Sequence, residues 1–208
     1  MCVRRTFAEG GAVPDAARRN HTIDAFRGLL PHIPQGARTA LDVGCGEGFA
    51  ARALAARGLA VTAIDLHEPS LERARSQDTA GIAYLNADVM TAQLPGGYDV
   101  ITALAVLHHL PLEESLRRLK ELLAPGGVLL VVGLAASVMP RDVGWEAAAA
   151  VAHQVGRLTH STWEQPSPTV WPPPATYAQV RDAAARVLPG SRFRRRVQWR
   201  YTLTWVKP

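Results

Sequence analysis

The fold is decided by Ala40-Leu41-Asp42-Val43-Gly44-Cys45-Gly46-Glu47-Gly48-Phe49, where a short apolar run breaks into closely spaced glycines and then into a helical pattern. Leu41 and Val43 are strand-type residues, and the alanine-rich run 49–57 favours a helix that Gly58 ends. Glycines between a strand and a helix allow positive φ and let a ligand approach where a Cβ would collide. This order of elements predicts a binding site for a nucleotide-like ligand.

The glycine spacing and a later acidic residue narrow the class of ligand. The pattern is G-x-G-x-G, whereas a dinucleotide-binding G-x-G-x-x-G motif would need glycine at Phe49. Asp65 ends the next apolar run, 60–65. A carboxylate there can accept hydrogen bonds from both ribose hydroxyls, which favours an adenosine ligand. The alternative is an aspartate that caps a helix or faces solvent.

Strand-like and helix-like segments alternate along most of the chain. A helix is expected to run from Asn20 to Pro31 or Pro34, because Ile23, Phe26, Leu29 and Leu30 have helical spacing. Further strands are expected at 82–86, 98–104 and 128–133, the last after a turn at 124–127, and further helices begin near 68, 112 and 177. Residues 192–197 and 201–206 can form a final hairpin. This order predicts an α/β fold with right-handed crossovers, in which ligands bind beyond the carboxyl ends of parallel strands.

Length and composition allow one globular core. The 208 residues are 48% hydrophobic and 20% charged, which suits a single domain over 1–208 with a flexible N-terminal tail at 1–19. No apolar run resembles a signal or a membrane span, so we expect a cytoplasmic protein. The two cysteines are too few for a disulfide framework. The sequence carries a net charge of +5, and its basic residues cluster only at 192–200. We interpret this cluster as the solvated face of a strand. The alternative is a basic surface that binds nucleic acid.

Several motifs together resemble the class I S-adenosylmethionine (SAM)-dependent methyltransferases. They are Asp42 with the glycine turn, Asp65, Asn86-Ala87-Asp88-Val89, the pair His108-His109, and Leu-x-Pro-Gly-Gly-x-Leu at 123–129. The chain is similar to small-molecule and natural-product members of the methyltransferase type 11/25 group from actinobacteria. The segment from Trp163 to the triple proline at 172–174 and the ending Trp199-Arg200-Tyr201 also resemble uncharacterised members of that group. The resemblance covers most of the chain and names no substrate.

The resemblance implies a Rossmann-like domain and a set of cofactor residues. The sheet is expected to have seven strands, mostly parallel, with a reversed final strand and helices on both faces. SAM is the expected cofactor and S-adenosylhomocysteine the product. Asp65 would bind the ribose, and Asp88 and Val89 would bind the adenine, although Asp88 can also be read as an Asx-type turn. The complete set of expected cofactor residues is Asp42, Gly44, Cys45, Gly46, Gly48, Asp65, Leu66, Asp88, Val89 and Leu104.

Two histidines follow the fourth expected strand and are candidates for catalysis. A phenol, alcohol or protonated amine must lose a proton when it is methylated, and histidine has a suitable pKa for accepting it. His108 is the first candidate base and His109 the second, while at least one of them is expected to be structural. No acidic cluster like that of metal-dependent catechol-type enzymes follows this strand, so we expect no metal.

An insertion at 135–175 interrupts the alternation and is expected to cover the acceptor site. It contains an expected helix from Trp145 to Leu158 and a Pro- and Trp-rich stretch. The alternative is that its tryptophans fix the insertion to the domain or to a second subunit. The candidate substrate residues are Asn20, His21, Trp145, His160, Trp163 and Trp171. Asn20 can equally be read as a helix N-cap.

The sequence thus predicts methyl transfer from SAM to an oxygen or nitrogen of a small acceptor, aromatic or a natural product, with a histidine base. The alternatives are an RNA or protein methyltransferase and a SAM-binding protein without catalysis. The motif Asn/Asp-Pro-Pro-Tyr/Phe, used for planar amino nitrogens of nucleobases, is absent from the sequence. A nucleic-acid partner is therefore disfavoured, and no membrane partner is expected, because no apolar run reaches the length of a span. The protein is expected to be a monomer or a homodimer.

Overall fold

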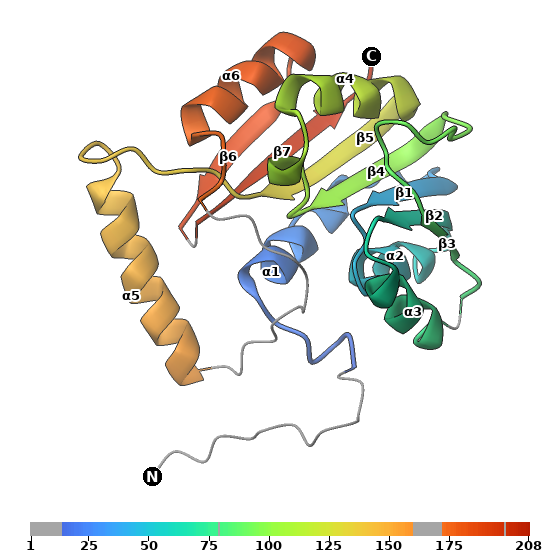
Figure 1. Ribbon diagram of the computed structural model, residues 1–208, viewed down its shortest axis with the longest axis horizontal. Coiled ribbons are helices and arrows are strands. Elements are labelled where there is room, and N and C mark those ends of the chain that lie inside the picture. The colour runs from blue at the N-terminus through green and yellow to red at the C-terminus, as the bar shows by residue number, and fades with distance from the viewer. Residues whose placement is uncertain (1–13, 79, 160–171, 198) are drawn as a thin grey trace.

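The computed structural model describes residues 14–78, 80–159, 172–197 and 199–208. Within them the chain forms a seven-stranded sheet in the order β3-β2-β1-β4-β5-β7-β6 (Figure 1). β1 to β5 pair in parallel, and β7 is antiparallel to both of its neighbours. The strands are β1 (Thr39–Val43), β2 (Ala60–Asp65), β3 (Ala83–Asn86), β4 (Tyr98–Leu104), β5 (Leu123–Gly133), β6 (Arg192–Arg196) and β7 (Arg200–Val206). This confirms the predicted Rossmann-like sheet with a reversed final strand.

Helices cover both faces of the sheet. The α-helices are α1 (His21–Arg27), α2 (Phe49–Ala55), α3 (Glu68–Ser76), α4 (Leu112–Leu122), α5 (Val143–Thr159) and α6 (Tyr177–Val187). Short 3-10 helices occur at η1 (Leu30–His32) and η2 (Leu107–His109). α4 and α6 pack on one face, and α1, α2 and α3 pack on the other (Figure 1).

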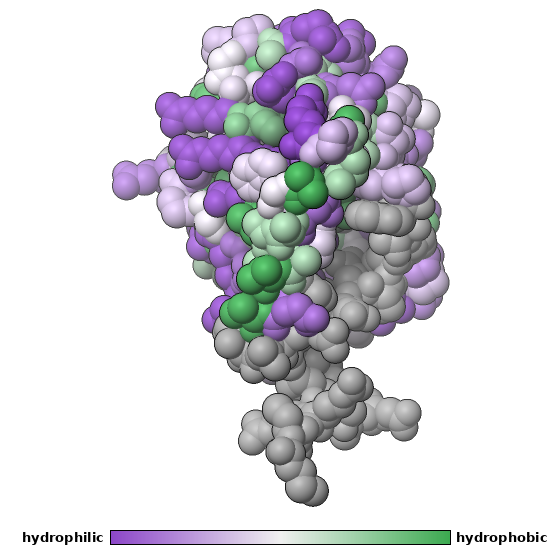
Figure 2. All heavy atoms as spheres, turned by 90° about the vertical axis from the view of Figure 1, so that its left-hand side faces the viewer, coloured by the Kyte–Doolittle hydropathy of each residue, from purple (hydrophilic) through white to green (hydrophobic). Residues whose placement is uncertain are grey.

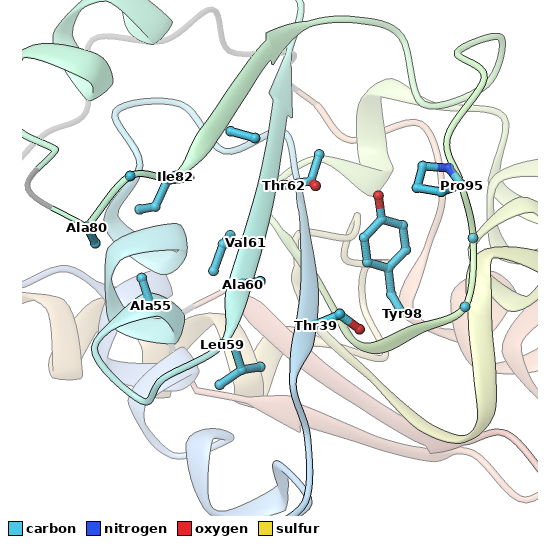
Figure 3. Close-up of a pocket in the computed structure, with 14 residues that line it drawn as sticks. Thr39, Ala55, Leu59, Ala60, Val61, Thr62, Ala80, Ile82, Pro95 and Tyr98 are labelled. Atoms are coloured by element: carbon cyan, nitrogen blue, oxygen red, sulfur yellow. The ribbon is translucent and has the colours of Figure 1, made fainter.

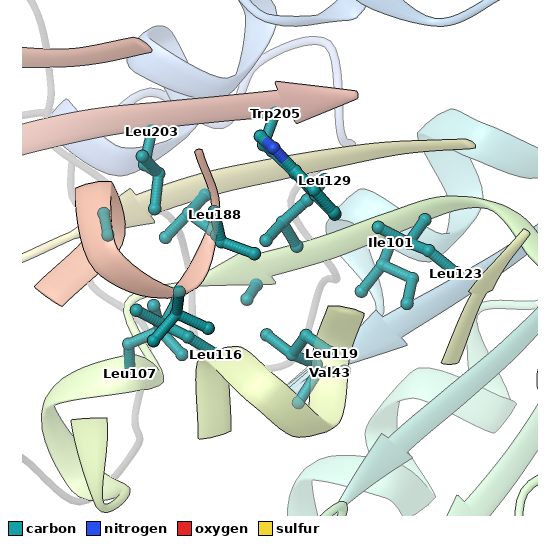
Figure 4. Close-up of a cluster of buried hydrophobic side chains, with 14 of the residues drawn as sticks. Val43, Ile101, Leu107, Leu116, Leu119, Leu123, Leu129, Leu188, Leu203 and Trp205 are labelled. Atoms are coloured by element: carbon teal, nitrogen blue, oxygen red, sulfur yellow. The ribbon is translucent and has the colours of Figure 1, made fainter. Parts of the chain in front are cut away.

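The central strands contribute side chains to both hydrophobic layers. In β5, Leu129 and Val131 belong to the layer under α4 and α6, whereas Val128, Leu130 and Val132 belong to the other layer. Successive residues of a strand point to opposite faces, so a strand buried on both sides reads as a continuous apolar run. Figure 4 shows the first layer, where leucines of α4 meet side chains of β4, β5 and β7. The two layers fix the strands whose carboxyl ends form the candidate site.

Two element boundaries differ from those expected. α1 ends at Arg27, before either proline, because Gly28 is a poor helix former and Pro31 stands near the start of η1, a separate turn. β5 begins at Leu123, so the expected turn at 124–127 lies within the strand. The strand accommodates it through Gly126, whose φ is 76°, and through a register shift against β4.

Residues 14–19, the described part of the expected flexible tail, pack against the domain. Arg18 is only 1% exposed, and its guanidinium lies near the carboxylates of Asp15 and Glu47. Asp15 also accepts hydrogen bonds from Nε and Nη2 of Arg52 on α2, at 2.7 and 2.9 Å. Ion pairs therefore dock this part of the segment, and the prediction for residues 1–13 lies outside the described residues.

The insertion after β5 carries α5, which lies beside the sheet rather than on either of its faces (Figure 1). Val143, Val151 and Val155 on this helix are exposed, and Figure 2 shows hydrophobic side chains along it. Its first turns are nevertheless fixed to the final hairpin, because Glu146 accepts a hydrogen bond from Nε1 of Trp199 at 2.8 Å. The expected helix in the insertion is thus present.

Candidate active site

A cavity of about 910 Å³ opens at the carboxyl ends of the parallel strands. Residues from the ends of β1, β2 and β4 line it, together with the loops that follow β3 and β4. The start of α1 and the turn before β7 close its other side. Ligand cavities commonly measure about 300–1,000 Å³. The volume is near the upper end of that range, so the cavity offers room for a cofactor and a small acceptor together.

The glycine turn after β1 shapes one wall of this cavity, although its three glycines serve different purposes. Gly44 lines the cavity at φ 64°, and a Cβ there would lie 2.6 Å from Cγ2 of Val106. Gly46 donates its N–H to Oδ2 of Asp65 at 2.7 Å and does not line the cavity. Gly48 also lies away from the lining, at φ 77°, and a Cβ there would collide with the hydroxyl of Tyr84. Gly48 is therefore required by packing and by its backbone conformation.

Asp65 lies at the end of β2, where two loops meet. Its Oδ2 accepts the Gly46 N–H and its Oδ1 accepts the His67 N–H at 2.8 Å. Each carboxylate oxygen has further lone-pair capacity, so Asp65 can also accept hydrogen bonds from a ligand. The neighbouring Leu66 is 66% exposed and lines the same cavity, which offers a ring an apolar surface beside the carboxylate.

Asp88 forms the Asx-type turn and also lines the cavity, so its assignment to the cofactor stays a prediction. Its Oδ1 accepts the Met90 N–H at 2.9 Å, which is the Asx-type turn. Asp88 also lines the cavity together with the buried Val89. The turn therefore holds the carboxylate in place without removing it from the site.

Asp42 is a buried carboxylate that lines the cavity. The Thr102 hydroxyl donates to its Oδ1 at 2.7 Å, whereas its Oδ2 has no hydrogen-bond partner among the described residues. Burial, together with the nearby negative charge of Asp65, raises the pKa of Asp42 to about 7. A cationic ligand would satisfy Oδ2 and favour the ionised form. Burial also raises the pKa of the adjacent Cys45 thiol, which fits a small packing residue rather than a nucleophile.

His108 and His109 stand side by side in η2, with ring centroids 4.1 Å apart, and both line the cavity. His108 is 8% exposed, and its Nδ1 has no hydrogen-bond partner among the described residues. Burial lowers the pKa of His108 to about 4, and the positive charges of His109 and Arg200 act in the same direction. At neutral pH this imidazole is uncharged. His109 is exposed at the mouth.

The turn that presents the two histidines is conformationally strained. Ala105, which follows β4, has a φ of 54°, in the left-handed region that glycine favours. Its N–H donates to the Val132 carbonyl at 2.7 Å, so the sheet holds it in place. Strained residues of this kind cluster at functional sites. Here the strain turns the chain from β4 into η2.

The expected substrate residues fall into three groups. Asn20 caps α1, with its Oδ1 accepting the Ile23 N–H at 2.8 Å, and it also lines the cavity beside His21. Trp145 is not part of the lining; it is 41% exposed, and the guanidinium of Arg195 lies 4.9 Å from its ring centroid. The remaining expected substrate residues lie outside the described residues: His160, Trp163 and Trp171.

The cavity also contains lining residues that the sequence did not single out. Thr22 and Ile23 come from α1, and Leu134 follows β5. Trp199 and Arg200 come from the final hairpin, whose tripeptide with Tyr201 was noted only as a resemblance. Topology places them there, because β7 lies next to β5 and runs in the opposite direction. The start of β7 therefore meets the carboxyl end of β5.

A second hollow, of about 600 Å³, lies at the opposite end of the strands (Figure 3). It is lined by the first residues of β1, β2, β3 and β4 and by small or apolar side chains. Among the described residues, its lining contains no acidic, basic or histidine side chain. This hollow offers no chemistry comparable to that of the larger cavity.

The described residues contain no group of three His, Cys, Asp or Glu side chains that could hold a metal ion. The expectation of a metal-independent reaction stays a prediction. In the same part of the chain, no helix is both long and apolar enough to span a bilayer.

The sequence is similar to those of known methyltransferases. A family profile described as a methyltransferase domain matches residues 41–131, from β1 into β5. An uncharacterized methyltransferase of Mycobacterium tuberculosis is 38% identical over 179 residues, which are 85% of this chain and 90% of that protein. A ubiquinone biosynthesis O-methyltransferase of Pseudomonas aeruginosa is 41% identical over 93 residues, which are 42% of this chain and 40% of that protein.

A solved structure shares the fold at low sequence identity. The magnesium protoporphyrin IX methyltransferase of Synechocystis, with bound S-adenosylhomocysteine, has a TM-score of 0.60 and 18% identity. The match covers 90% of this chain and 82% of that one. The match to the mycobacterial methyltransferase covers 85% of this chain and is therefore longer than the stretch matched by the profile. The chain therefore belongs to the class I SAM-dependent methyltransferases.

Proposed function

We propose that this methyltransferase methylates an oxygen or nitrogen of a small acceptor, aromatic or a natural product, with His108 as the base. The observation that carries the proposal is one cavity shared by the carboxylates of Asp42, Asp65 and Asp88 and by both histidines. The carboxylates come from or directly follow β1, β2 and β3, whereas the histidines follow β4. Such an arrangement separates a cofactor half from an acceptor half.

The residues of the cofactor half fit SAM. When bound, SAM supplies an electrophilic methyl group on a positively charged sulfur. Asp65 would accept the ribose hydroxyls, Leu66 and Val89 would contact the adenine, and Asp88 would accept from its amino group. Oδ2 of Asp42 is buried without a hydrogen-bond partner among the described residues, which suits a cationic ligand. Cys45 and Leu104, which also line the cavity, would complete the surface.

His108 would hold the acceptor and take its proton as the new bond forms. Its pKa near 4 keeps the imidazole neutral at pH 7 but also makes it a weak base. Most of the rate would then come from orienting the acceptor, and proton transfer would add a smaller factor. His109 is the second candidate, because its ring lies against that of His108 and reaches the mouth of the cavity.

The insertion would cover the acceptor half. This part of the proposal is supported by the hydrogen bond from Trp199, a lining residue, to Glu146 on α5. Asn20 and His21 would contribute from α1. Trp145, which packs on Arg195, would stabilise the base of the insertion rather than touch the acceptor.

An RNA substrate is the second candidate, and the basic strand β6 argues against it. Arg192, Arg194 and Arg196 alternate with residues that turn inward, and Phe193 stacks on Tyr201 with ring centroids 5.2 Å apart. No aromatic side chain interleaves with these arginines on the exposed side of the described strand. A nucleic-acid groove would combine positive charge with accessible stacking surfaces.

A methylation screen with labelled SAM tests the proposal. The panel contains phenols, indoles, sugars and peptides, with bulk RNA as the competing substrate. We expect transfer to a small acceptor, and His108→Ala to reduce turnover on the order of 10²-fold with the affinity for SAM retained. Transfer to RNA alone would favour the second candidate. Tight SAM binding without transfer to any acceptor would favour a binding protein, and wild-type turnover in the variant would exclude His108 as the base.

A further inference from the structure

The guanidinium of Arg200 is a partly buried charge that the proposed reaction leaves unexplained. Nε donates to Oγ1 of Thr22 at 2.9 Å, and Nη1 donates to the Trp199 carbonyl at 3.4 Å. It forms no ion pair with a described carboxylate, and Nη2 has no protein partner among the described residues. Removing a charge from water is costly unless an opposite charge compensates it, so a partly buried guanidinium without an ion-pair partner favours an anionic ligand. Burial accordingly lowers the pKa of Arg200.

The position of Arg200 in the sheet assigns it to the acceptor half. Arg200 begins β7, which is separated from β1 by β4 and β5. Three strand spacings amount to about 14 Å, so the start of β7 lies far from the glycine turn and farther still from Asp65 on β2. Arg200 nevertheless lines the same cavity as His108, and its charge acts on that imidazole. An acceptor bound beside His108 would therefore have Arg200 within the same part of the cavity.

The chain holds this guanidinium in a fixed place. Trp199, just before it, has a φ of 53°, and its indole donates to Glu146 on α5. Thr22 restrains Nε from α1, on the other side of the cavity. The hydrogen bonds engage Nε and one terminal nitrogen, so Nη2 and the remaining Nη1 N–H stay available to a ligand.

We propose that Arg200 is a specificity-determining residue that binds a carboxylate of the methyl acceptor. The Nη1–Nη2 edge of a guanidinium matches the two oxygens of a carboxylate in a bidentate pair. Arg200 is the only Arg or Lys in the described lining of the cavity, and one cation balances one carboxylate. A phosphate carries about −1.5 to −2 charges at pH 7, so the single positive charge of Arg200 would not neutralise it. The acceptor is therefore a small organic acid.

This inference rests on the proposed function, and binding measurements can separate the two. The protein is saturated with S-adenosylhomocysteine and then titrated calorimetrically with benzoate, phenylacetate and octanoate and with the primary amide of each. We expect at least one acid to bind at least about tenfold more tightly than its amide, because a charge-assisted bidentate pair is lost in the amide. Arg200→Gln removes this preference, and Arg200→Lys restores part of it.

The matched control is Arg196→Gln, which alters the exposed arginine paired with Arg200 across the hairpin. It should keep the preference for the acid. Equal or undetectable binding of every acid and amide by the wild type overturns the inference, as does a preference that survives in Arg200→Gln. Weaker binding of S-adenosylhomocysteine in Arg200→Gln would also overturn it, because the guanidinium would then serve the cofactor. Failure of the wild type to bind S-adenosylhomocysteine would instead refute the proposed function.

Discussion

Replacement of Asp65 by Ala should weaken cofactor binding by more than the loss of its structural hydrogen bonds explains. The carboxylate accepts two backbone N–H groups, from Gly46 at 2.7 Å and from His67 at 2.8 Å, and it lines the cavity. Its proposed hydrogen bonds to the ribose are charge-assisted, and their loss should cost about 2–3 kcal/mol of binding free energy. The Kd for SAM and for S-adenosylhomocysteine should therefore rise about 30- to 150-fold. Calorimetric titration measures both constants.

The chain offers a matched control for this variant in Asp78. Asp78 also accepts two backbone N–H groups, from Ala80 at 2.9 Å and Ile82 at 2.8 Å, but it does not line the cavity. Asp78→Ala loses the same kind of structural hydrogen bonds and should bind SAM as the wild type does. Urea denaturation of both variants measures the structural loss independently. A Kd for Asp65→Ala within about twofold of the wild-type value would refute the assignment of Asp65 to the cofactor.

Three further predictions concern the walls of the cavity. Gly44→Ala should lower the free energy of unfolding, measured by urea denaturation, by about 1–3 kcal/mol, because φ is 64° and the Cβ would lie 2.6 Å from Cγ2 of Val106. Gly36→Ala, whose Cβ meets open space, should leave the free energy of unfolding unchanged. Equal stability of the two variants would contradict this prediction. Because the pKa of Asp42 is near 7, SAM should bind more tightly as pH rises from 6 to 8, since the carboxylate must lose its proton to attract the cation. Asp42→Asn should abolish this pH dependence. A pH-independent Kd in the wild type would argue against contact between Asp42 and SAM. The pKa of His108 near 4 lies below its unfolded value near 6.5, so the unfolded chain binds more protons in this window and stability should fall by up to about 3 kcal/mol as pH drops from 6.5 to 4. Denaturation of His108→Gln across the same range should lack that contribution, and an unchanged slope would contradict it.

The parts of the site that are local in sequence could be predicted. The turn after β1 and the aspartate ending β2 are read from apolar runs, glycine spacing and a carboxylate at a fixed place in one β/α unit. His108 and His109 follow β4 in the same way. Each of these residues is placed by the strand that precedes it, and the carboxyl ends of parallel strands meet at one edge.

The residues that depend on distant packing could not be predicted. Arg200 reaches the cavity only because β7 inserts between β5 and β6 and turns its start toward α1. The sequence predicts Trp145 as a substrate residue, but its ring packs on Arg195 of β6 outside the lining of the cavity. The glycine pattern predicts Gly48 as a cofactor residue, yet the hydroxyl of Tyr84 from β3 lies beside it. No local pattern in the sequence carries this information.

SAM should lie in the cavity at the carboxyl edge of the sheet, against Asp42, Asp65 and Asp88 and with its sulfur toward His108. A crystal structure of the protein with S-adenosylhomocysteine tests this most directly. We expect the ribose hydroxyls within hydrogen-bond distance of Asp65 and the adenine beside Leu66 and Asp88. Density for the ligand in the hollow at the opposite ends of the strands, or with its ribose away from Asp65, would contradict this placement of SAM.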